Sequence, residues 1–477
     1  RIKLLEDPHE EVKKAALIAA GNLGHPSLWS YLFNSLADDR LVAPASSAIL
    51  AIGTSTIPAL DSHFYKSNKA KNAQLRMIPL LGVLGGESAI NALRKKLSFP
   101  DQHIKDQVII TLSDLNYKPT YLERDGLISE IDNKVETALW LLSLKVNLAS
   151  AELSSYFHQA VNEAYDQQVE MIFHLLVILE GDKKIIGVAP ELYSQSDDTQ
   201  KGYATELLTM ILPKEMKPKL VPLFENTSDD QKVRTLTSYY ASDKFTVYDC
   251  LRGIVLRDFN TVGCWIKTLA IFELLRLFPQ KSKPIFVAMA FVTTPLIAQA
   301  ALYALRETDP ERYELLQKEL ITTLPPEKAA LLSLDNGKLI ADQIKELHKS
   351  ELFQQFRLQD LDSLGTNAVF KALKTGEEIP IETRKSGSKN YLLMVTHGEV
   401  NVYLEGGEEQ LIQAINCGPS LFQQGSKNKI TKVKATSAAE VYFLDRHAVY
   451  NLMSEHTKLI ENILAYETKY NTEKTGQ

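Results

Sequence analysis

The chain has few cysteines and no marked excess of either charge. Its three cysteines are Cys250, Cys264 and Cys417, and three scattered thiols cannot supply a disulfide scaffold or a zinc cluster. The net charge is −6 and there is no long basic run, which argues against a general nucleic-acid binder. No secretory signal peptide opens the sequence. We therefore expect a protein of the reducing cytoplasm that does not bind nucleic acid.

Motifs for catalysis are also scarce. The segment Gly425-Ser-Lys-Asn-Lys429 lacks the spacing and the Lys-Ser/Thr end of a phosphate-binding loop. No two histidines stand at a metal-binding spacing, and there is no Gly-x-Ser-x-Gly nucleophile elbow. The carboxylate pairs Asp38-Asp39 and Asp229-Asp230 fall at expected inter-helix turns, where helix capping explains them. We expect no enzymatic activity, no catalytic residue and no metal site.

Long uncharged runs are limited to one stretch. Ile285 to Leu305 holds 21 residues without a charge, which is long enough to span a bilayer. However, Pro295 follows Thr293-Thr294, and a proline after a capping residue is typical of a helix start. We interpret the stretch as two successive buried helices of a soluble array.

The first quarter of the chain contains an internal repeat. Each unit has an amphipathic helix, in most units preceded by an aspartate at a turn, and a glycine or asparagine that ends the helix. The closing residues Gly24, Gly53, Gly85 and Asn116 lie 29, 32 and 31 residues apart. The four apolar stripes are Val12, Ala15, Ala16, Ala19 and Leu23; Val42, Ala45, Ile49 and Ile52; Leu75, Ile78 and Leu81; and Ile104, Val108, Leu112 and Leu115. The pattern resembles HEAT repeats and predicts regular stacked helices over residues 1–118.

The next part of the chain stays helical while the repeat becomes irregular. Residues 135–142 and 168–178 are apolar runs typical of buried helices. Repeat-like units return at Leu220, Asp258 and Pro295. We expect residues 119–332 to form divergent HEAT-like repeats that continue one solenoid, because each unit needs its neighbours to bury its apolar face.

The remaining residues, 333–477, carry a different set of motifs. In chain order these are Glu346-Leu-His-Lys-Ser-Glu-Leu-Phe353, Leu373-Lys-Thr-Gly-Glu-Glu-Ile379, Tyr391-Leu-Leu-Met-Val-Thr-His-Gly-Glu-Val-Asn-Val-Tyr403 and Lys434-Ala-Thr-Ser-Ala-Ala-Glu-Val-Tyr-Phe-Leu-Asp-Arg446. Their order and spacing resemble a cyclic-nucleotide-binding domain of the CRP type. The resemblance implies an antiparallel β-roll with a leading helix and a closing helix over Asn451–Leu464. The predicted fold class is thus mainly α, a HEAT-like α-solenoid followed by this roll.

The resemblance also places a phosphate-binding cassette. Its candidate ligand-binding residues are Gly418, Phe422, Gln423, Gln424, Lys429 and Thr431. Phe422-Gln423-Gln424 stands where the family has Phe-Gly-Glu, so the close-approach glycine and the ribose-binding carboxylate are both absent. Lys429 falls near the family's arginine, and a lysine cannot replace the bidentate guanidinium at a phosphate. We expect a degenerate pocket without a cofactor. In the alternative, a cyclic nucleotide or another anion binds Lys427, Lys429, Lys432 and Lys434.

Two functions remain open. The first is a non-enzymatic regulatory module that binds a protein partner on the solenoid surface. The alternative is a nucleotide sensor that regulates its partner through the solenoid. The order of the two parts resembles the cytoplasmic tail of some bacterial transporters of the ADP/ATP-translocase type. That resemblance implies a membrane-transporter domain upstream of Arg1 and a tether to the inner membrane.

Overall fold

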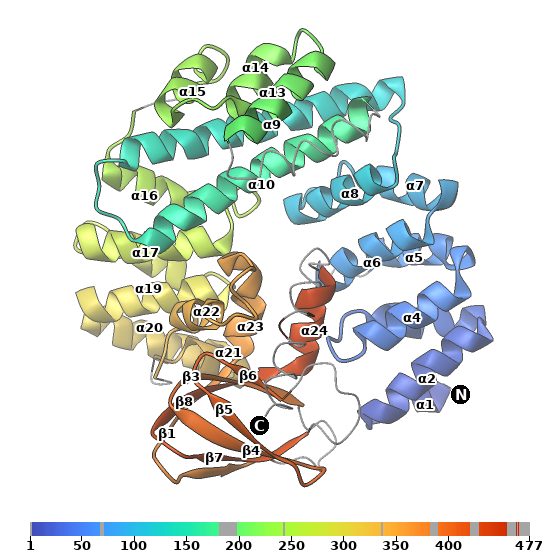
Figure 1. Ribbon diagram of the computed structural model, residues 1–477, viewed down its shortest axis with the longest axis vertical. Coiled ribbons are helices and arrows are strands. Elements are labelled where there is room, and N and C mark those ends of the chain that lie inside the picture. Colours follow the sequence, from blue (N-terminus) through green and yellow to red (C-terminus); the bar gives the residue numbers. More distant parts are fainter. Residues whose placement is uncertain are drawn as a thin grey trace. The chain divides into compact units, whose positions relative to one another are not determined.

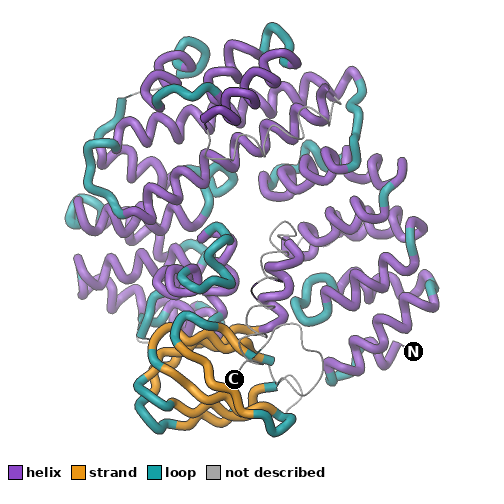
Figure 2. The backbone as a smooth tube through the Cα atoms, in the orientation of Figure 1, coloured by secondary structure: helices purple, strands orange, loops and turns teal. Residues whose placement is uncertain are grey.

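Among the residues that the structure describes, most are helical, and strands occur only in the last part of the chain. The structure, a computed structural model, describes residues 2–66, 71–180, 198–241, 244–334, 337–381, 390–419 and 429–455, together with Leu464 and Tyr466. It divides into two compact units, Arg1–Asp7 with Glu11–Gly263, and Cys264–Gln477 with Pro8–Glu10. Figure 1 and Figure 2 show helices up to α23 and antiparallel strands after it. A mainly helical chain with C-terminal antiparallel sheets is therefore confirmed. The HEAT-type solenoid and the boundaries at residues 118 and 332 stay predictions.

The first unit is helical throughout its described residues. Its elements are α1 (Ile2–Leu5), α2 (Glu10–Leu23), η1 (Pro26–Leu28), α3 (Trp29–Ser35), α4 (Val42–Ile52), η2 (Thr54–Thr56), α5 (Ile57–Lys66), α6 (Lys71–Leu84), α7 (Gly86–Arg94), α8 (Gln102–Asp114), α9 (Tyr121–Leu148), α10 (Ser155–Glu180), α13 (Asp198–Ile211), α14 (Lys217–Phe224), α15 (Asp229–Leu236) and α16 (Val247–Leu256).

The predicted helix ends are confirmed at all four closing residues. Gly24, Gly53, Gly85 and Asn116 have φ values of 63°, 85°, 65° and 55°, and each directly follows a helix or lies within two residues of its end. Side chains other than glycine and asparagine rarely adopt this left-handed conformation. The sequence pattern therefore located these turns correctly.

The prediction of which face of α2 is buried is wrong, because the buried face is rotated about the helix axis from the predicted one. The buried residues are Leu17, Ala20 and Gly21, whereas Ala15, Ala19 and Leu23 of the predicted stripe are exposed. A Cβ added to Gly21 would lie 2.6 Å from the Cα of Ala48 in α4. The two helices thus meet at a glycine, which a stripe defined by apolar side chains does not detect.

This close approach gives a first prediction. Gly21→Ala should lower the free energy of unfolding by about 1–3 kcal/mol, because the new methyl group overlaps backbone atoms of α4. The matched control is Gly126→Ala in α9, where nothing lies within 4 Å of the added Cβ. The control should raise stability by about 0.5–1 kcal/mol through helix propensity alone. Urea denaturation followed by circular dichroism measures both, and a stabilising Gly21→Ala would contradict the packing.

A cluster of polar side chains fixes the start of α9. Thr120 and Glu123 form a capping box, and Glu123 also accepts hydrogen bonds from the Tyr117 hydroxyl at 2.6 Å and from Arg94 Nε at 2.7 Å. Burial alone would raise the pKa of Glu123, but the hydrogen bonds from Thr120, Tyr117 and Arg94 outweigh it and hold this pKa at about 2. The carboxylate thus links the end of α7 to the start of α9.

The lowered pKa of Glu123 gives a second prediction. Its stabilisation should be complete above the ordinary value of 4.5 and should be lost as the pH falls towards about 2, because the unfolded chain takes up the proton first. Glu123→Gln should lower stability at neutral pH and flatten this acid dependence. The exposed Asp125→Asn serves as the control, and denaturation curves across this pH range give the measurement. An unchanged acid dependence in Glu123→Gln would refute the assignment.

The second unit begins with helices and ends in the strands. Its helical elements are α17 (Cys264–Leu277), α18 (Lys283–Ala290), α19 (Pro295–Thr308), α20 (Pro310–Thr323), α21 (Pro326–Leu332), α22 (Ile340–His348), η3 (Leu358–Leu361), α23 (Asp362–Asn367) and α24 (Arg446–Glu455).

The uncharged stretch from Ile285 to Leu305 is divided between two helices. It covers most of α18 and α19, and α19 begins at Pro295 as predicted. Among the described residues, no single helix has the length and apolarity needed to cross a bilayer. One bent pair, Val42–Ile52 with Thr54–Lys66, meets those criteria only jointly, across a bend of 103°.

The leading helix of the C-terminal part is shorter than predicted. The sequence favours one helix over residues 338–356, but α22 ends at His348. The chain then turns back, with the Ser350 hydroxyl donating to the Leu347 carbonyl at 3.0 Å. The His348 ring nitrogen Nε2 lies 3.1 Å from the Phe356 carbonyl oxygen. These turns bury Phe353 and Phe356.

In the described part of the C-terminal region, eight strands form two four-stranded antiparallel sheets. The order is β1-β8-β3-β6 in one sheet, here called sheet A, and β2-β7-β4-β5 in the other, sheet B. The strands are β1 (Val369–Leu373), β2 (Glu378–Pro380), β3 (Tyr391–His397), β4 (Glu399–Leu404), β5 (Glu409–Gln413), β6 (Cys417–Gly418), β7 (Ile430–Ala435) and β8 (Ala439–Asp445). The turn between β4 and β5 contains Gly407 with a φ of 83°. We refer to the two sheets together as the roll.

Candidate functional site

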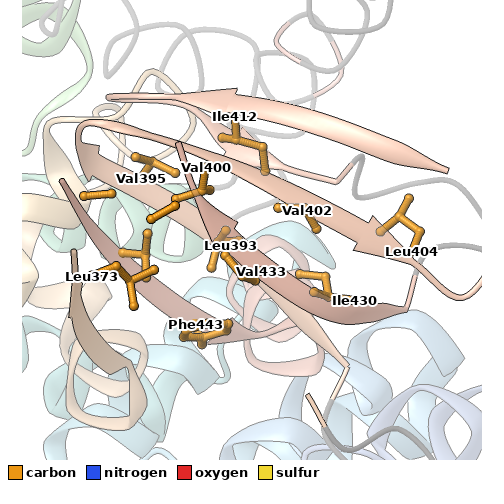
Figure 3. Packing of buried hydrophobic residues seen from close by; sticks show 13 residues of the cluster. Leu373, Leu393, Val395, Val400, Val402, Leu404, Ile412, Ile430, Val433 and Phe443 are labelled. Atoms are coloured by element: carbon orange, nitrogen blue, oxygen red, sulfur yellow. The ribbon is translucent and has the colours of Figure 1, made fainter. Parts of the chain in front are cut away.

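The interior of the roll is filled by apolar side chains. Both sheets contribute to one cluster in which every member is at most 4% exposed, and Figure 3 shows its side chains gathered between the strands. Its members are Leu373, Leu393, Val395, Val400, Val402, Leu404, Ile412, Ile430, Val433, Ala435, Ala439, Val441 and Phe443. Such a cluster stabilises the fold by removing apolar surface from water but offers no group that would bind a charged ligand.

Strand β7 carries a bulge at one of the predicted site residues. Lys432 pairs with Tyr403 and Ile430 pairs with Leu404, so Thr431 is an extra residue on β7. The Thr431 hydroxyl donates to the Tyr403 carbonyl at 2.9 Å, and its own carbonyl accepts from the Ile381 amide at 2.8 Å. Both of these backbone contacts hold the bulge in place.

The bulge changes which residues of β7 face the interior. Simple alternation from Val433 would turn Thr431 and Lys429 inward. The bulge instead makes Ile430 a member of the buried cluster. Lys429 directly precedes β7. Lys429 is half-buried, and within the described part of the chain no ion pair is found for it.

The two following lysines lie outside the roll and share one carboxylate. Lys432 Nζ is 3.3 Å and Lys434 Nζ is 3.1 Å from the Glu378 carboxylate on β2. Hydrogen bonds from Lys434 and Lys432 lower the pKa of Glu378, and the hydrogen bond that Lys434 donates to Glu378 raises the pKa of Lys434. Lys432 also lies over the Tyr403 ring, 4.3 Å from its centroid. Both lysines are therefore held at the surface by contacts outside the apolar cluster.

The remaining predicted site residues are only partly described. Gly418 lies in β6, where it pairs with Leu393 of β3. Phe422, Gln423 and Gln424 fall outside the described residues, as does Lys427. The structure thus places Gly418, Lys429 and Thr431, and their role in ligand binding stays a prediction.

Two side chains that the sequence analysis did not select hold β6. Arg446 is 2% exposed and donates from Nε to the Tyr391 carbonyl at 3.1 Å and from its guanidinium to the Pro419 carbonyl at 2.9 Å. The Tyr466 hydroxyl accepts from the Cys417 amide at 3.1 Å. Arg446 could have been noticed as the last residue of the Leu-Asp-Arg motif. Tyr466 lies in a polar tail and gave no signal.

The residue Gln410 is an exception to the apolar interior. It alternates with Glu409 and Leu411 on β5, which are exposed, and is itself 7% exposed. It lies opposite Val402 of β4, and its side-chain oxygen Oε1 is buried without a hydrogen-bond donor among the described residues. An unpaired buried acceptor is destabilising, so this amide is the inward polar group that a ligand could use.

No metal centre is indicated in the described ranges. They contain no group of three or more His, Cys, Asp or Glu side chains able to hold an ion.

Burial, and then the charge of Asp249, raise the pKa of the Cys250 thiol to about 11, which keeps it protonated at neutral pH.

Comparisons with known proteins find likenesses over part of the chain only. No family model and no curated protein matches it. The sensor domain of the transcriptional regulator DNR from Pseudomonas aeruginosa is 14% identical with a TM-score of 0.24, and the match covers 29% of this chain and 94% of that one. The regulatory domain of Toxoplasma gondii PKA, crystallised with cAMP, is 20% identical with a TM-score of 0.19, over 24% of this chain and 44% of that one. The Thermus thermophilus catabolite activator protein is 19% identical with a TM-score of 0.21, over 26% and 60%.

The buried amide of Gln410 gives a third prediction. Gln410→Met keeps the side-chain volume but removes the unpaired acceptor, and should raise the free energy of unfolding by about 1 kcal/mol. Gln413→Met on the same strand is the control, because Gln413 is exposed and donates to Glu399 at 2.8 Å, so that change should bring no gain. Thermal and urea denaturation measure both variants. A destabilised Gln410→Met would mean that the amide oxygen has a partner in solution.

Proposed function

We propose that this chain is a non-enzymatic regulatory module whose roll no longer binds cyclic nucleotides in the usual way. The observation that carries the proposal is the bulge at Thr431. It places Ile430 in an apolar interior, where the phosphate of a cyclic nucleotide would require a positive charge. The proposal assigns no catalytic step to any residue.

The surroundings of the bulge support the same conclusion. The cluster around Ile430 and Val433 is apolar and well buried, and an uncompensated phosphate charge in such a place would be strongly disfavoured. Lys432 and Lys434 already share an ion pair with the Glu378 carboxylate. Recruiting either lysine would require it to leave that ion pair and cross to the other face of the sheet.

The helical part supplies the second half of the proposal. HEAT-like repeats would offer an extended protein-binding surface, and the close contact of α2 with α4 at Gly21 supports repeat-like stacking. We further propose that the partner is a membrane-transporter domain on the cytoplasmic side. The support for this step is the order of helical repeats followed by a roll.

The alternative is a nucleotide or anion sensor. Gln410 favours it, since an inward amide with a free acceptor could bind an N–H of a base. In this reading the ligand would contact Gln410 and a positive charge near Lys429, and binding would change the contacts of the helical part.

The fourth prediction is that the chain does not bind common nucleotides. Isothermal titration with cAMP, cGMP, ATP and ADP should give no saturable heat of binding with any of the four. A thermal-shift assay provides a second readout, since a ligand at about 100 times its Kd would add about 2.7 kcal/mol of stability. Silence in both assays supports the proposal.

Matched variants decide the meaning of any positive result. Binding that Lys429→Ala abolishes and Lys432→Ala retains would overturn the proposal and establish the sensor with Lys429 at its anion site. Binding that survives both changes but is lost in Gln410→Met would also overturn it, and would place the ligand in the roll interior.

A further inference from the structure

A buried glutamine of α19 fixes the start of α22. The Gln299 side chain is nearly inaccessible, 3% exposed, and its Oε1 accepts from the Ile340 amide at 2.7 Å. Its Nε2 lies 3.1 Å from the Leu331 carbonyl and 3.4 Å from the Ser333 carbonyl. An amide side chain offers both a donor and an acceptor, so one residue satisfies backbone groups on both sides of residues 334–339.

This contact acts as a helix cap supplied by another helix. Ile340 is the first residue of α22, and the residue before it, Leu339, makes no side-chain cap. The amides at a helix start have no partner within the helix. Gln299 therefore stabilises the start of α22 from a position 41 residues earlier.

Two residues before Ile340, the chain is held by the roll. Lys338 Nζ lies 2.6 Å from the Glu440 carboxylate on β8. The same ammonium is 4.7 Å from the centroid of Phe370 on β1 and 5.8 Å from that of Tyr442 on β8. Phe370 and Tyr442 pack on each other with ring centroids 5.3 Å apart, on the face of sheet A turned away from the apolar cluster.

The backbone beside Lys338 also lies against β1. Gly337 has a φ of 85°, and a Cβ at this position would lie 3.6 Å from the Phe370 ring. Within residues 337–340, the chain thus contacts β1 and β8 through one side chain and α19 through one backbone amide. A movement of β1 and β8 relative to α19 has to strain one of these two contacts.

We propose that Gln299 and Lys338 are the two ends of a latch that couples strands β1 and β8 to helix α19. Any change in the roll that displaces Glu440 would loosen the hydrogen bond between Gln299 and Ile340. Only the biological use of the latch rests on the proposed regulatory function; the latch itself is a property of the chain without ligand.

Hydrogen exchange of the Ile340 amide in the full chain tests the latch. Gln299→Met should speed its exchange about tenfold, the factor that corresponds to about 1.4 kcal/mol. Lys338→Met and Glu440→Gln should each speed it about threefold, although neither residue touches that amide. The control is Lys371→Met, an exposed lysine on β1, which should leave the exchange unchanged.

The outcomes separate the latch from simpler readings. Normal exchange at Ile340 in both Lys338→Met and Glu440→Gln, with faster exchange in Gln299→Met, would overturn the latch and leave only a helix cap. Protection of the β4 amides Val400–Tyr403 shows whether a variant still folds, and Glu440→Gln, which removes one charge without changing shape, answers the question if Lys338→Met does not fold. No nucleotide is added, so failure of the latch is distinct from failure of the proposed function.

Discussion

Thr431 is an extra residue in β7, and the character of the roll interior follows from it. Because two residues of β7 occupy the space of one on β4, Ile430 joins the buried cluster while Lys432 and Lys434 remain on the outer face. Both outer lysines form ion pairs with Glu378. The apolar side chains of the strand thus face inward and these lysines outward, and the bulge adds Ile430 to the inward set. The absence of usual nucleotide binding that we propose depends on this separation.

Local patterns in the sequence predicted much of the fold. The four helix ends at Gly24, Gly53, Gly85 and Asn116 depend on a backbone conformation that few residues adopt, so their positions could be read directly. The start of α19 at Pro295 had a similarly local cause. The face of α2 could not be read in this way, because the contact with α4 is made at Gly21, which carries no side chain.

The candidate site was harder to predict because its geometry depends on contacts between distant residues. The sequence motifs predicted the positions of the strands correctly. Along the chain, strands β3 to β8 follow one another in the order that the motifs imply. The burial of Ile430 depends on the bulge, which is set by pairing with β4 and cannot be seen along β7 alone. Gln299 and Arg446 satisfy backbone groups that lie 41 and 55 residues away in the sequence. No rule of sequence spacing connects such partners. The departures from the family pattern at Gln423 and Gln424 were evident from the sequence, whereas their effect on binding is a proposal.

The most direct measurement of this account is a methyl NMR titration of the chain with cAMP. Val402, Ile412 and Ile430 report on the roll interior, where all three are buried, and Val83 is an exposed reference in the helical part. The account predicts that none of these methyl signals moves at saturating excess of the nucleotide. Selective and saturable shifts of Val402, Ile412 and Ile430, with Val83 unchanged, would show a ligand inside the roll and contradict the account.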